Sequence, residues 1–116
     1  MFITTAIVTS LLAIALIGSA RAKLVKDDKV MAAMATVGIP SDKVWALAAA
    51  ELAGAAGLLA GLSWWPIGVA AAIGVILYFA GAVISHVRVH DKHIQPAAVL
   101  LLIAVAALIL RLITIP

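Results

Sequence analysis

The chain has 116 residues, of which 66% are hydrophobic and 11% are charged, with a formal net charge of +3 and no cysteine. A soluble domain of this size is about half apolar and about a quarter charged, so this composition indicates an integral membrane protein. The absence of cysteine excludes disulfides, thiolate nucleophiles, Cys-ligated zinc and iron–sulfur clusters. We expect one membrane domain over residues 1–116.

Four segments are apolar over the length of about 20 residues that a helix needs to cross the hydrocarbon core. Lipid offers no hydrogen bonds to the backbone, so each segment should be a helix, and the lack of period-2 alternation argues against a barrel. The prediction is an all-α, four-helix membrane bundle. Its spans are Phe2–Ala20, Val44–Leu62, Trp65–Ser85 and Ala97–Thr114.

The first span has one alternative interpretation, a cleaved signal peptide, because Ala20-Arg21-Ala22 has the small-x-small pattern of a cleavage site. A signal peptide carries its positive charge before the apolar run. Here no positive side chain precedes the run, whereas Arg21 and Lys23 follow it. We therefore expect a retained helix.

The first loop should contain a short helix over Lys29–Val37 at the membrane interface, with a plain loop as the alternative. Asp27 and Asp28 are suited to cap it, and Ser41 or Asp42 to cap the next span. One face of the short helix would carry its apolar side chains, which are Val30, Met31, Met34 and Val37.

The basic residues predict the topology. Seven of the eight Lys and Arg residues lie in loops 21–43 and 86–96, and the other is Arg111. The positive-inside rule then places both loops in the cytoplasm and both termini outside, in a bacterial inner membrane, with Arg111 reaching outer headgroups. The same placement explains the basic charge without nucleic acid as a partner.

Small residues should form the contact between the second and third spans, which a short turn joins into an antiparallel hairpin. They recur along one line of each helix and could equally form a dimer face. The residues are Ala49, Ala53, Gly57 and Gly61, facing Ala70, Gly74 and Gly81.

Glu51 is the charged residue that topology does not explain. It lies seven residues into the second span, on the order of 10 Å below its cytoplasmic edge at 1.5 Å per residue. A carboxylate at that depth should face the bundle interior. Tyr78 lies at the matching depth of the next span, so we expect the two side chains to form a hydrogen bond or share a small polar cavity. A proton-accepting site and a simple link between helices are both open interpretations.

The second cytoplasmic loop holds His86, His90 and His93 at helical spacing. No second ligand cluster accompanies them, so we predict no metal site, and one segment cannot supply facing haem ligands within a protomer. His86 is the candidate proton carrier. Lys23 and Arg88, with Glu51 and His86, are candidates to line a polar mouth that binds a headgroup, a quinone or an oxyanion.

The chain resembles the DoxX-like membrane proteins. The resemblance rests on Lys23-Leu24, Val37-Gly38-Ile39-Pro40, the Glu51–Leu59 run, His86 and Pro96-Ala-Ala, in this order over nearly the whole chain. It implies a four-helix membrane protein of redox character, in a family named for a subunit of a thiosulfate:quinone oxidoreductase. Lys23, Glu51 and His86 match the family pattern.

The leading hypothesis is an accessory or anchor subunit of a membrane redox system that contacts quinone or another lipophilic molecule near Glu51. It has no catalytic activity of its own, and its partners are the bilayer, an oxidoreductase subunit and, as an open question, a second copy. One alternative is a small membrane enzyme with Glu51 and Tyr78 as its acid–base pair and His86 as a further catalytic candidate. A purely structural or transport protein is the other alternative.

Overall fold

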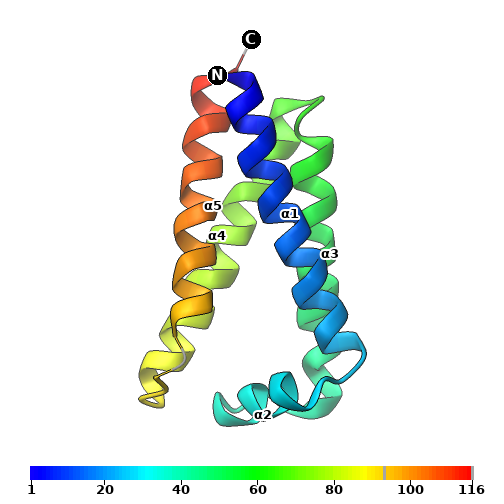
Figure 1. Ribbon diagram of the computed structural model, residues 1–116, viewed down its shortest axis with the longest axis vertical. Coiled ribbons are helices and arrows are strands. Elements are labelled where there is room, and N and C mark those ends of the chain that lie inside the picture. The colour runs from blue at the N-terminus through cyan, green and yellow to red at the C-terminus, as the bar shows by residue number, and fades with distance from the viewer. Residues whose placement is uncertain (93, 116) are drawn as a thin grey trace.

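The computed structural model describes residues 1–92 and 94–115. Four long helices run along the long axis of the molecule, and a short helix lies across one end (Figure 1). The elements in chain order are α1 (Phe2–Leu24), α2 (Asp28–Thr36), the 3-10 turn η1 (Ser41–Lys43), α3 (Val44–Ala60), α4 (Trp65–Arg88) and α5 (Gln95–Ile113).

The four long helices are long and apolar enough to cross a membrane, which confirms the predicted four-helix membrane fold. Two of them are longer than predicted, because α1 continues to Leu24 and α4 to Arg88. The backbone turns to positive φ only afterwards, at Lys26 (55°) and His90 (55°). A helix can therefore project past the apolar stretch that defines it in the sequence.

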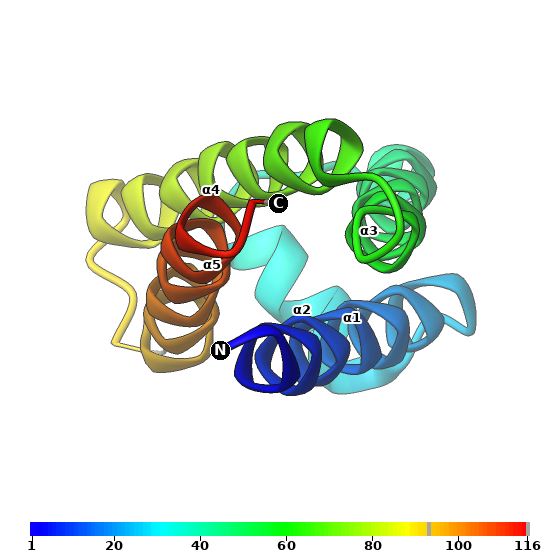
Figure 2. The same cartoon turned by 90° about the horizontal axis from the view of Figure 1, so that it is seen from above.

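The long helices form a ring. In the view from above, α1 lies between α3 and α5, and α4 closes the ring on the opposite side (Figure 2). Residues on the inner faces pack together, as the spacing of three and four along each helix requires. The packed core is made of small and branched side chains, among them Leu12, Leu16, Ala55, Leu58, Ala72, Val75, Phe79 and Ala104.

Two glycines set the closest contact in the ring. A Cβ built on Gly61, which directly follows α3, would lie 2.0 Å from the Gly68 Cα of α4, and one on Gly57 would lie 2.8 Å from the Ala71 Cβ. The predicted α3 ridge is thus confirmed at Gly57 and Gly61. The predicted α4 ridge is wrong, because a Cβ on Gly74 meets no atom within 4 Å. Gly68 and Ala71, which lie on a neighbouring face of α4, form the contact instead.

Arg111 is not the exposed anchor that the sequence suggested. Its side chain is buried at the end of the bundle that holds both termini, where it donates a hydrogen bond to the Thr114 hydroxyl (3.1 Å) and lies over the Phe2 ring (5.5 Å). Thr5 of α1 is fully buried and approaches the Thr114 hydroxyl at 3.3 Å. These contacts join α1 to α5.

The predicted short helix in the first loop exists and is α2. The Asp27 carboxylate accepts a hydrogen bond from the Val30 amide (3.3 Å), and Gly38 ends the segment at a φ of 83°. The expected cap of the next span is wrong: Ser41 and Asp42 belong to η1, and α3 begins without a side-chain cap. In Figure 1, α2 lies across the end of the bundle opposite the termini, which we call the α2 end.

Candidate functional site

Glu51 faces the interior of the bundle, as predicted. It follows Ala48 and precedes Ala55 and Leu58 on the buried face of α3, so the helix itself turns the carboxylate inward. Its side chain is 0% exposed. Burial of a carboxylate is costly unless a partner compensates it, so the identity of that partner defines the site.

The partner is Lys23 of α1, which the sequence reasoning did not pair with Glu51. The Lys23 ammonium lies 2.6 Å from Glu51 Oε1 and donates a second hydrogen bond to the Ser19 hydroxyl at 2.8 Å. A signal for this pair exists in the sequence. Lys23 continues the stripe of Leu12, Leu16 and Ala20 that forms the buried face of α1, so its side chain should point inward.

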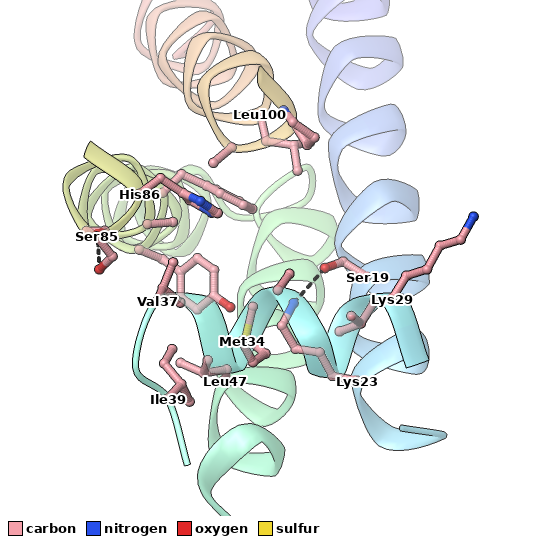
Figure 3. A pocket seen from close by; sticks show the side chains of 18 residues that line it. Ser19, Lys23, Lys29, Met34, Val37, Ile39, Leu47, Ser85, His86 and Leu100 are labelled. Atoms are coloured by element: carbon pink, nitrogen blue, oxygen red, sulfur yellow. Dashed lines mark hydrogen bonds between the residues drawn. The ribbon is translucent and has the colours of Figure 1, made fainter. Parts of the chain in front are cut away.

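A cavity of about 550 Å³ lies beside this ion pair, at the α2 end of the bundle. We call it the α2-end cavity. Lys23 and Ser19 face it from α1 and His86 faces it from α4, whereas Lys29 extends away (Figure 3). Met34 of α2 and Val37, which directly follows α2, form part of its wall, and this agrees with the apolar face predicted for the short helix. Its lining is mostly apolar, and the polar residues that line it besides Lys29 are Ser19, Lys23, Tyr78, Ser85 and His86.

A second cavity, of about 380 Å³, lies between α3 and α4, and we call it the lateral groove. Glu51 and Tyr78 both line it, so the prediction that they share a cavity is confirmed. Tyr78 and Phe79 line both cavities and stand between them. Glu51 Oε2, in contrast to Oε1, is buried without a hydrogen-bond partner among the described residues.

His86 is tied to the loop that follows α4. Its Nδ1 atom lies 2.6 Å from the Asp91 carboxylate, and the two side chains are 13% and 9% exposed. An Nδ1–H group donating to Asp91 fixes the ring, so the other nitrogen, Nε2, is the one available to a ligand. His86 therefore lines the α2-end cavity, and its role as a proton carrier stays a prediction.

The other candidates in that loop do not join the site. Arg88 and His90 are exposed and line neither cavity in the described part of the chain. His93 lies outside the described residues, so the predicted three-histidine face stays a prediction. Over residues 1–92 and 94–115, no group of three or more His, Asp or Glu side chains is placed to hold a metal ion.

The chemistry of the site follows from its donors and acceptors. Lys23 has three N–H groups, of which Glu51 and Ser19 take two, so one is left for a ligand. The Tyr78 hydroxyl and His86 Nε2 add two further groups that exchange hydrogen bonds. Such a set of polar groups in an apolar cavity can orient one polar end of a lipophilic molecule.

Comparison with known proteins gives a family. The profile of the DoxX-like family matches residues 7–109, which include α3 and α4, most of α1 and α5, and the lining of both cavities. Among curated proteins and among solved structures, no match was found.

Proposed function

Because the chain belongs to the DoxX-like family of membrane proteins, we propose that it acts as an accessory membrane subunit of a redox system and binds a lipophilic carbonyl compound of the quinone class in the α2-end cavity. The observation that carries this proposal is the cavity itself. Its volume of about 550 Å³ is typical of small-molecule sites. The apolar walls suit a ring and tail, and polar groups from α1 and α4 reach the cavity from two sides.

The polar groups suit carbonyl oxygens. A quinone accepts hydrogen bonds through two oxygens on opposite sides of its ring. Lys23 on α1 and His86 on α4 face the cavity from opposite walls, and Tyr78 lies between the two cavities. A quinone supplies two-electron redox chemistry when bound. The chain's own residues hold its oxygens, exclude water and provide a protonated ammonium beside them.

The ion pair favours this role over that of a self-contained enzyme. Glu51 Oε1 is held by Lys23 at 2.6 Å and Glu51 does not line the α2-end cavity, so its carboxylate is poorly placed to act as a general base on a molecule bound there. The chain also lacks cysteine for thiol chemistry. Electron transfer would therefore belong to a partner subunit, with the present chain supplying the membrane-embedded binding site.

The glycines of the chain allow a sharp test. A Cβ on Gly81 meets no atom within 4 Å, and Gly81 lines the α2-end cavity, so we expect the side chain of Gly81→Leu to occupy space in the cavity. Gly18 is equally unobstructed but faces outward from α1 and lines neither cavity, which makes Gly18→Leu the matched control. Both changes replace a helical glycine with leucine, so they alter helix propensity alike.

The measurement is the thermal unfolding midpoint in lipid nanodiscs with and without ubiquinone bearing a decyl tail. We expect the quinone to raise the midpoint of the original chain and of Gly18→Leu, and to leave that of Gly81→Leu unchanged. Equal stabilisation of Gly81→Leu, or none of the original chain, would refute the binding site. Purification from native membranes in a mild detergent tests the subunit role, which requires a co-purifying oxidoreductase.

A further inference from the structure

The lateral groove opens toward the surrounding bilayer. Ala50, Ala53 and Gly74 line it and are exposed on the outer surface of the ring. Half of the residues that line it are alanine or glycine, so α3 and α4 leave a slot where larger side chains would otherwise meet. A membrane-soluble molecule can therefore reach the groove sideways, without passing α2 or entering water.

At the deep end of the groove, one carboxylate oxygen of Glu51 makes no direct hydrogen bond to a described residue, although the Tyr78 hydroxyl lies close enough to interact with the carboxylate. The Glu51 side chain is 0% exposed, and its Oε2 atom lacks a hydrogen-bond partner in the described part of the chain. A buried acceptor left in this state destabilises the fold, so a donor that reached it would be bound favourably. Tyr78 is the other polar side chain that lines the groove among the described residues.

We propose that the lateral groove is a binding site for a slim lipophilic molecule that carries a hydroxyl group and donates it to Glu51 Oε2. This site differs from the α2-end cavity, with which it shares Tyr78 and Phe79 as a common wall. The Tyr78 hydroxyl provides a second contact for the same ligand hydroxyl, because a hydroxyl both donates and accepts.

The charges favour a neutral donor over a cation. Lys23 already compensates the Glu51 carboxylate at 2.6 Å. An ammonium brought to Oε2 would add a second positive charge beside Lys23 in a region of low dielectric, where like charges repel strongly. A hydroxyl satisfies the same oxygen without adding charge.

The walls set the shape of the ligand. The groove has a volume of about 380 Å³, near the lower end of small-molecule sites. A Cβ on Gly54 would lie 2.9 Å from Val75 Cγ2, whereas one on Gly74 meets no atom within 4 Å. The space that is open thus lies on the Gly74 side. A flat ring or an unbranched chain fits a slot of this kind.

The test uses a photoreactive probe in nanodiscs that contain the full chain. The probe is a 4-alkylphenol with a diazirine in its alkyl chain, and its methyl ether, which lacks the donor, is the matched control probe. Labelled residues are identified by mass spectrometry. We expect the phenol to label residues 50–54 and 71–79, and the ether to do so about ten- to a hundredfold less, as the loss of one hydrogen bond to a charged group predicts.

The variants separate this site from the α2-end cavity. Gly74→Leu should abolish the label in the groove, whereas Gly81→Leu and Gly18→Leu should leave it intact. Conversely, quinone stabilisation should be lost in Gly81→Leu and kept in Gly74→Leu. Failure of one proposal is therefore distinguishable from failure of the other.

Three results of the labelling would overturn the inference, and a fourth comes from competition. The three are equal labelling by phenol and ether, unchanged labelling of Gly74→Leu, and label that disappears as a second copy of the chain covers the groove at high protein-to-lipid ratio. Unlabelled diacylglycerol and an unlabelled short-chain quinol serve as competitors. The one that removes the label identifies whether the hydroxyl comes from a lipid or from a reduced quinone, and if neither removes it the proposal is wrong.

Discussion

At the scale of single residues, the Lys23–Glu51 ion pair links the middle of α3 to the last turn of α1. The two side chains are 9% and 0% exposed, so water contributes little to compensating either charge. The pair contributes less to stability than its short distance suggests, because both charges had to leave water. Removing one partner is a different matter, since the other charge then stays buried alone.

We predict that Lys23→Met lowers the free energy of unfolding by about 3–5 kcal/mol, the range for breaking a buried pair. The measurement is an unfolding titration in mixed micelles. The double variant Lys23→Met with Glu51→Leu should recover most of the loss, because it removes both charges together. A double variant as unstable as the single one would show that packing of the lysine stem, and not charge, holds α1 against α3.

The two residues of this pair differ in how far the sequence could predict them. Glu51 could be placed in the interior because a charge in the middle of an apolar span has few alternatives. Lys23 sits where basic residues normally mark topology, so its position alone favoured an anchoring role. Only the register of α1 against α3 decides that Lys23 reaches Glu51, and a register depends on packing over the whole helix pair.

At the scale of elements, the α3–α4 hairpin depends on backbone contact at Gly61 and Gly68. We predict that Gly61→Ala destabilises the protein by about 1–3 kcal/mol, as overpacking does, because its Cβ would lie 2.0 Å from the Gly68 Cα. Gly74→Ala is the matched control. It should stabilise the helix by about 1 kcal/mol, since its methyl group meets no atom within 4 Å. Unfolding titrations of both variants check the pair, and equal effects would contradict the contact.

The helix α2 offers a prediction about local stability. Asp27 caps it through the Val30 amide at 3.3 Å, and none of its residues is buried. We predict that Asp27→Ala weakens α2 by about 1 kcal/mol, which corresponds to about fivefold faster amide exchange over residues 28–36. Hydrogen–deuterium exchange by mass spectrometry measures this. Asp28→Ala, next in the chain, is the control, and faster exchange along α1 and α3 as well would mean that α2 is not a separate unit.

The elements show which signals in the sequence were sufficient. Apolar length predicted the four long helices, and the Asp27 cap with its apolar face predicted α2. The line of small residues on α4 was predicted on the wrong face, because Gly68 and Ala71 match the spacing as well as Ala70 and Gly74 do. Spacing alone identifies the contact face of a helix only when small residues are confined to one face, and α4 carries small residues on two faces.

At the scale of the whole molecule, the placement of both polar loops at one end agrees with four membrane crossings (Figure 1). The positive-inside rule further predicts that this end is cytoplasmic. The chain has no cysteine, so single cysteines can be labelled without background. We expect Ser63→Cys to react with an impermeant maleimide in intact cells, and Lys26→Cys to react only after permeabilisation. The reverse labelling pattern would mean that the polar loops lie outside and both termini lie in the cytoplasm.

The cavities belong to this largest scale, and no sequence signal predicted them as volumes. Composition predicted the membrane, and the polar residues predicted that Glu51 and Tyr78 lie close together. The α2-end cavity arises because the helix pairs diverge toward α2, and the angle between them is set by the sum of all packed side chains. The sequence could therefore predict which polar residues gather, but not the space beside them.

The Gly61–Gly68 contact has a mechanical consequence for that space. The contact lies near the end of α4 that is remote from α2, and it is the point where the backbones of Gly61 and Gly68 touch. From Gly68 to Ser85 the helix extends for about 25 Å at 1.5 Å per residue. A rotation of α4 by about 5° about this contact would therefore displace the far end of the helix, where Tyr78 and His86 lie, by up to about 2 Å. Because the two backbones touch at these glycines, the angle between α3 and α4 at this contact affects the width of the α2-end cavity near the opposite membrane surface.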